Sequence, residues 1–179
     1  MESEIIKIVK ETPTNKYCCL SAEKIKKTNI VFEERVFLKC LTCQKYNQKW
    51  TCPPNIPNLN YRKAISEYDY RLLVYNKVEF NKETFIDVRR MSSRELHKNL
   101  LSLENYLWNN GFFLATSFIG GSCKFCDGDC SKNFCRYPTK SRIPIEALGI
   151  NIVKTAKNIG LDIKFPVDKI FYRIGLLLW

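Results

Sequence analysis

The sequence predicts an α+β fold: a mostly antiparallel sheet with helices on one face and cysteine-rich metal-binding loops at its end. Three observations predict this. Strand-like and helix-like segments alternate loosely, without the regular strand–helix–strand repeat of a parallel sheet. Hydrophobic residues make up 45% of the 179 residues, which is enough for one core. Seven of the nine cysteines fall in two loop-like stretches. We therefore expect one metal-binding domain over residues 1–179.

The first half of the chain predicts two strands and a short helix. A hydrophobic segment predicts a strand over 30–38, leading into the first cysteines. Pro53 and Pro54 predict a loop after it. Asn58 is a candidate N-cap for a short helix through residue 65. Residues 70–80 are again strand-like.

A long helix and a strand are expected next. Ser92 and Glu95 form a capping box that predicts the start of the helix, and Gly111 predicts its end. A strand is expected over 112–119. The helix carries one apolar stripe of leucines at spacings of four, three and four: Leu96, Leu100, Leu103 and Leu107.

The last third predicts a helix and two strands. Pro144 suits the first turn of a helix that Gly160 closes. A short strand is expected over 161–165, and the continuous apolar segment 171–178 is typical of a central strand. The helix would bury one stripe: Ile145, Leu148, Ile152 and Ala156.

The composition indicates a cytoplasmic protein. There is no secretory signal at the N-terminus and no apolar run of the ~20 residues that cross a bilayer. Nine cysteines in a reducing compartment are expected to bind metal rather than to form disulfides. The net charge of +11 is compatible with nucleic acid or an acidic protein as a partner.

The second cysteine group has the pattern Cys-x2-Cys-x3-Cys-x4-Cys. Four thiolates in one compact run can close on one centre, and this packaging is closer to a ferredoxin cubane than to the two separated knuckles of structural zinc. We therefore expect an iron–sulfur cluster of the 4Fe–4S type, one or two per chain, with zinc as the alternative. The ligands of this group are Cys123, Cys126, Cys130 and Cys135.

The first cysteine group, Cys40, Cys43 and Cys52, has only three ligands. A fourth ligand would come from Cys18, from Cys19, from the second group, or from no residue, which leaves one metal position open to substrate. We otherwise expect Cys18 and Cys19 to be core or spare thiols, because adjacent cysteines rarely bind one metal together.

Other catalytic signals are weak. The lone histidine, His97, has no cysteine near it in sequence and is expected to face solvent on its helix rather than to bind metal. The sequence contains no Walker-type phosphate loop, no dinucleotide fingerprint and no Gly-x-Ser-x-Gly elbow.

At the cysteines the sequence resembles a family of small cysteine-rich prokaryotic proteins, known as predicted metal-binding proteins of anaerobic bacteria and methanogenic archaea. The resemblance covers roughly residues 36–178 and implies a metal centre that is iron–sulfur in character. The matching features are Cys40-x2-Cys43, Trp50-Thr51-Cys52-Pro53-Pro54, Gly120-Gly121-x-Cys123-x2-Cys126, Cys130, Cys135-Arg136-x-Pro138 and Glu146-Ala147-x-Gly149-Ile150.

Three functions remain open from the sequence. The leading expectation is a redox protein whose cluster transfers electrons to a partner enzyme or activates it. The second is an enzyme that binds substrate at the open iron of a three-cysteine cluster. The third is a zinc-stabilised basic module that binds nucleic acid, which is compatible with the charge but not favoured.

Overall fold

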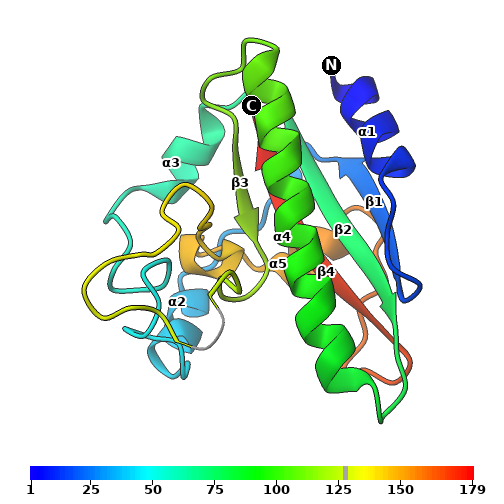
Figure 1. Ribbon diagram of the computed structural model, residues 1–179. Helices are drawn as coiled ribbons and strands as arrows, with labels where there is room; N and C mark the ends of the chain where they lie inside the picture. The colour runs from blue at the N-terminus through cyan, green and yellow to red at the C-terminus, as the bar shows by residue number, and fades with distance from the viewer. Residues whose placement is uncertain (127–128) are drawn as a thin grey trace.

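The fold is a four-stranded antiparallel sheet with helices packed on it, as Figure 1 shows for the computed structural model. The structure describes residues 1–126 and 129–179. The strands are β1 (Cys18–Lys24), β2 (Arg71–Glu79), β3 (Thr116–Ile119) and β4 (Ile170–Leu178), in the order β1-β2-β4-β3. All three pairings are antiparallel. The α+β class expected from the sequence is confirmed.

Strand β4 lies in the middle of the sheet, between β2 and β3. Its last residues, Leu176, Leu177 and Leu178, are almost completely buried. A strand covered on both faces needs apolar side chains at consecutive positions, so the prediction of a central strand at 171–178 is confirmed. Strand β2, expected over 70–80, is also found, and its residues 71–74 are all buried.

Two helices cover one face of the sheet: α1 (Glu2–Glu11) and the long α4 (Phe85–Asn109) (Figure 1). The four leucines of the predicted stripe are all buried in the core between α4 and the sheet. Gly111 follows α4 with φ at 88°, a conformation that suits glycine at a helix C-terminus.

Short elements pack on the opposite face. They are α3 (Tyr61–Ser66), α5 (Ile152–Lys157) and the 3₁₀ segments η1 (Lys27–Asn29) and η2 (Ile145–Leu148). Apolar residues of α3, α5 and η2 form a second core with alternate residues of β2 and β4: Ile65, Leu73, Ile145, Leu148, Ala156, Ile174 and Leu176. Both faces of the sheet are therefore covered by packed side chains.

Two expectations in the first half of the chain are wrong. Residues 30–38 form no strand: Phe32 makes a single bridge to Ile150, and helix α2 (Arg35–Leu41) follows. A short apolar run fits a helical turn as well as a strand, and here the helix prevails. Helix α3 is capped by Asn60, whose side chain accepts a hydrogen bond from the Lys63 amide, and not by Asn58.

Helix α4 begins before the expected capping box. Its first residue is Phe85, next to an Asn81–Thr84 turn in which Asn81 Oδ1 accepts the Thr84 amide at 2.8 Å. Ser92 lies inside the helix, is buried and donates to the Arg89 carbonyl. The Ser92–Glu95 pattern therefore matches a capping box in sequence, although both residues lie inside the helix.

The helix expected from Pro144 to Gly160 is divided in two. Gly149 adopts φ of 78°, which ends η2 and lets α5 start after Asn151, whose side chain accepts the Lys154 amide. Strand β3 begins only at Thr116, and no strand forms over 161–165. A segment counts as a strand only where it pairs with a neighbour: β3 pairs with β4 from Thr116 onward, and residues 161–165 pair with no strand.

Candidate metal centre

The two cysteine groups lie on the same side of the molecule, beyond the β3 edge of the sheet (Figure 1). Cys40 is in the last turn of α2, and Cys43 and Cys52 are in the turns that follow. These turns are closed by backbone hydrogen bonds such as Cys43 N to Cys40 O at 3.1 Å. The second group begins soon after β3 ends at Ile119, so the sheet edge positions its first cysteine, Cys123.

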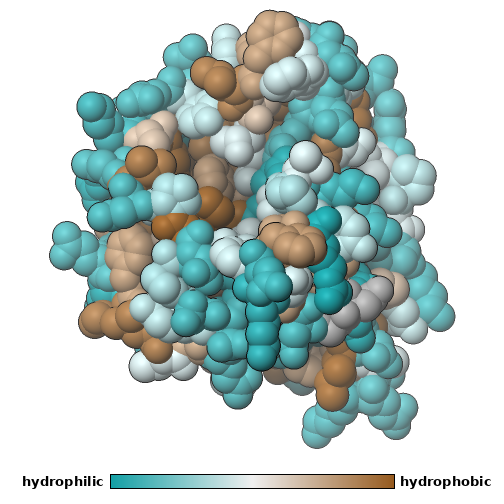
Figure 2. Space-filling model, turned by 60° about the vertical axis from the view of Figure 1, so that its left-hand side comes forward, coloured by the Kyte–Doolittle hydropathy of each residue, from teal (hydrophilic) through white to brown (hydrophobic). Residues whose placement is uncertain are grey.

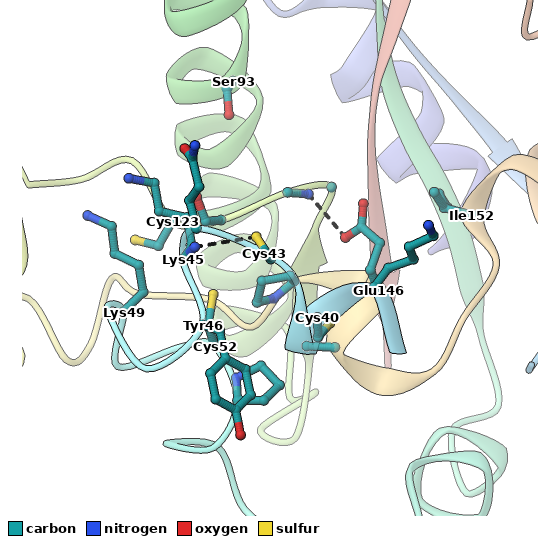
Figure 3. Close-up of a pocket in the computed structure, with 18 of the residues that line it drawn as sticks. Cys40, Cys43, Lys45, Tyr46, Lys49, Cys52, Ser93, Cys123, Glu146 and Ile152 are labelled. Carbon is teal, nitrogen blue, oxygen red and sulfur yellow. Dashed lines mark hydrogen bonds between the residues drawn. The ribbon is translucent and has the colours of Figure 1, made fainter. Parts of the chain in front are cut away.

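Five of the seven predicted ligands line one cavity of about 1650 Å³. Figure 3 shows Cys40, Cys43, Cys52 and Cys123 around it, and Cys126 is also in its wall. The face that carries these loops has a hollow with hydrophobic residues in it, framed by hydrophilic side chains (Figure 2). The fold thus brings together two groups that are about 70 residues apart in sequence. Cys130 and Cys135 lie outside the cavity lining.

Four thiols at the cavity resist ionisation, those of Cys40, Cys52, Cys123 and Cys126. Burial is the main reason that the pKa of Cys40, Cys123 and Cys126 is raised, and the other thiols add to the effect. The pKa of Cys52 is raised to about 11, first by burial and then by Cys43 and Cys40. Nucleophilic cysteines have lowered pKa values. Thiols of this kind become thiolates when a metal cation supplies the positive charge.

The described part of the chain holds no preformed site for a single metal ion. Among residues 1–126 and 129–179, no three His, Cys, Asp or Glu side chains converge on one ion position. Tetrahedral zinc, with Zn–S bonds of ~2.3 Å, needs sulfurs ~3.8 Å apart. A cubane cluster spreads its thiolates over four iron atoms and therefore accepts wider spacing.

Cys18 and Cys19 are remote from the cavity. Both lie in β1, at the sheet edge opposite β3, and neither lines the cavity. Cys18 is buried, and its sulfur accepts a hydrogen bond from Asn15 Nδ2 at 3.2 Å; Cys19 is exposed. Neither is placed to supply the missing ligand of the first group.

His97 does not face solvent, so that expectation is wrong. Its side chain is 1% exposed and meets Phe125 of the second cysteine loop edge-on, with ring centroids 4.5 Å apart. The loop covers the part of α4 that an isolated helix would expose. Burial, with a smaller effect of the Arg142 charge, lowers the pKa of His97 to about 4, so the ring is neutral near pH 7.

Glu146 is a cavity residue that the sequence did not single out as functional. Figure 3 shows it near Cys40, with one carboxylate oxygen accepting the Gly121 amide at 3.1 Å. Burial raises its pKa. The signal that was available is its position in the Glu146-Ala147 motif.

The cavity is also rich in cations, which the sequence did not reveal. Arg89 and Arg173 line it together with Lys124. The pKa of Lys124 is lowered by burial and then by Lys45 and Lys49 and the two arginines. Since these residues come from α4, β4 and both cysteine loops, no local motif unites them.

Known proteins were compared with the chain as a whole. A family model described as "Predicted metal-binding protein (DUF2284)" matches residues 23–179. No curated protein and no solved structure matches the chain. Among the residues that the structure describes, no helix is long and apolar enough to cross a membrane.

Proposed function

The chain belongs to the DUF2284 family of predicted metal-binding proteins, and on that premise we propose that it binds an iron–sulfur cluster and acts as a redox protein. Its cluster, of the 4Fe–4S type, would transfer electrons to a partner enzyme or activate it. The observation that carries the proposal is the shared cavity, because cysteines from both groups line its wall.

The compact run of four cysteines in the second group favours iron–sulfur over zinc. Structural zinc usually takes its thiolates from two well-separated Cys-x2-Cys knuckles instead. The turns around Cys40, Cys43 and Cys52 place all three thiols at one cavity.

The chain's own residues would hold and shield the cluster. The Lys45 amide donates to Cys43 Sγ at 3.4 Å, a contact of the kind that tunes a cluster potential. Arg94 Nε donates to the Lys124 carbonyl at 3.0 Å and fixes the second loop against α4. The cluster, when bound, supplies one-electron redox chemistry.

A second candidate is favoured by the size of the cavity. Small-molecule sites usually enclose ~300–1,000 Å³, and this cavity is larger. It therefore has room for a cluster and a substrate together. With Cys18 and Cys19 out of reach, the group of Cys40, Cys43 and Cys52 keeps an open position unless it shares a ligand with the second group. Such a position allows an enzyme to bind substrate at iron.

The zinc-stabilised nucleic-acid module is the weakest of the three functions. Nucleic acid needs cations on an accessible surface. Part of this chain's positive charge is instead enclosed, since Lys49 is buried and Arg173 is only partly exposed.

Metal analysis after strictly anaerobic purification tests the proposal. We expect iron and acid-labile sulfide in near-equal amounts, with broad absorption at about 400 nm. Colourless protein with stoichiometric zinc and no sulfide would disprove it. A cytoplasmic location, a redox partner protein and occurrence in anaerobes remain parts of the proposal.

A further inference from the structure

The cavity wall made by α4, β4 and the loop after β3 is positively charged. Arg89 comes from α4, Arg173 from β4 and Lys124 from the loop. These three segments are far apart in sequence, so their cations meet only in the folded protein. Like charges held together raise the energy of the empty site.

Arg173 is the most informative of these residues. Its Nη2 donates to the Arg89 carbonyl at 3.3 Å, and its guanidinium carbon lies 5.0 Å from the centre of the Phe171 ring. Its Nε is buried and has no hydrogen-bond acceptor among the described residues. A buried charged donor without an acceptor is costly, which indicates that an acceptor is supplied from outside the chain.

The carboxylates near this wall offset only part of its charge: Glu146 attracts Arg173 without touching it, and Asp129 also lines the cavity. Within residues 1–126 and 129–179, none of the three cations forms an ion pair with a carboxylate. Glu33 is engaged by Arg35 and Lys154. The Glu146 carboxylate, which faces the same cavity, accepts the Gly121 amide.

We infer that this wall binds the oxyanionic group of a small molecule, a phosphate or a pair of carboxylates, beside the cysteines. Guanidinium groups present parallel N–H donors that match such groups. Ser93 and Ser122 also line the wall and offer neutral donors. The inference deepens the proposed function by naming the ligand class of the cavity, and it rests on that function only for the identity of the neighbouring metal centre.

Calorimetric titration of the full-length protein, in the metal-loaded form in which it is purified, tests the inference. The probes are inorganic phosphate and malonate at low ionic strength, and the stronger binder identifies which oxyanion the wall prefers. We expect Arg173→Gln and Arg89→Gln each to weaken binding of that probe at least ~10-fold, the loss typical of one charge-assisted hydrogen bond. Arg62→Gln, a matched change on α3 outside the cavity lining, should leave binding unchanged.

Two results would overturn the inference. The first is a titration in which neither phosphate nor malonate binds, or in which Arg173→Gln and Arg89→Gln bind the probe as tightly as the unchanged protein does. The other is that the cavity variants lose metal in proportion to their loss of anion binding, because the cations would then serve the metal centre itself. Metal content is therefore measured on every variant. Arg89 is exposed, so Arg89→Gln keeps the test decisive if Arg173→Gln fails to fold. Zinc in place of iron would disprove the proposed function without changing either titration.

Discussion

Trp50 Nε1 donates a hydrogen bond to the carbonyl oxygen of Ser131 at 2.8 Å. The two residues belong to different cysteine loops and are 81 positions apart in sequence. This bond joins the first loop, just before Cys52, to the second, just after Cys130. The Trp50 side chain therefore links the two cysteine groups directly.

Replacing Trp50 by Phe should weaken the metal centre while keeping an aromatic ring in place. Loss of the hydrogen bond is expected to cost about 1 kcal/mol of stability and to speed metal loss to a chelator. Denaturant unfolding and chelator-release rates measure both effects. The control is Trp108→Phe, at an exposed position near the end of α4; equal effects in the two variants would contradict the role of the Trp50–Ser131 bond.

The ligand assignment predicts linked losses of metal and stability. Cys126→Ser and Cys130→Ser should lower both together, because metal binding energy becomes folding energy when the unfolded chain has no site. Cys19→Ser, at an exposed position of β1, should lower neither. Metal content and thermal unfolding, measured on the same preparations, test the ligand assignment. A Cys19→Ser variant that loses as much metal as Cys126→Ser would refute it.

An open position at the first group predicts sensitivity to added ligands. Cyanide should perturb the electron paramagnetic resonance signal of the centre held by Cys40, Cys43 and Cys52. Cys40→Ser should abolish the cyanide-sensitive signal, and Cys123→Ser should preserve it. If Cys123→Ser abolishes it too, the first group borrows Cys123, whose charge is among those that raise the pKa of Cys52, and the site is closed.

His97 predicts a loss of stability in mild acid. Its pKa falls from the ordinary value of 6.5 to about 4 in the folded chain, so the unfolded state binds the proton first as the pH falls. The stabilising contribution is complete above pH 6.5 and is lost between pH 6.5 and about 4, a change of ~3 kcal/mol. Unfolding free energies of the unchanged protein and His97→Phe should diverge across this window; parallel pH profiles would contradict the prediction.

A buried ion pair anchors the chain after the second cysteine group. Arg142 Nε donates to Glu104 Oε1 at 2.8 Å, and Ser117 donates to the same carboxylate. Glu104→Gln should destabilise the fold by about 3 kcal/mol, because it leaves a partly buried guanidinium unpaired. Asp162→Asn breaks an exposed pair with Lys164 and should cost at most ~1 kcal/mol. Chemical denaturation that finds equal losses would exclude an anchoring role.

Local patterns predicted the parts of the fold that local physics determines. The leucine stripe of α4 is periodic and the apolar run of β4 is continuous, so a single burial pattern fits each. The apolar segment 30–38 is too short for its pattern to distinguish a helix from a strand. The helix that forms there, α2, packs against η2, which is distant in sequence. Ser92 imitated a cap because a buried serine can satisfy its hydroxyl on the preceding helical turn.

The sequence predicted which cysteines gather at the site, but it did not predict the site's surroundings. Cysteine spacing identified the two groups, and their ligand roles stay a prediction. The cavity, the Arg173 wall and the burial of His97 arise from contacts between α4, β4 and both loops. Such contacts join residues up to about a hundred positions apart, and no local pattern encodes them. The sequence motif around Glu146 does not reveal a role for its carboxylate, because the Gly121 amide that donates to it lies 25 positions away in the chain.

The central place of β4 has a consequence for biosynthesis. Every cysteine precedes β4 in the chain, yet Arg173 of β4 forms part of the cavity wall. A ribosome that adds ~5–20 residues per second exposes the first cysteines many seconds before this wall exists. A nascent chain therefore carries its cysteine thiols without the β4 part of the cavity wall for that interval.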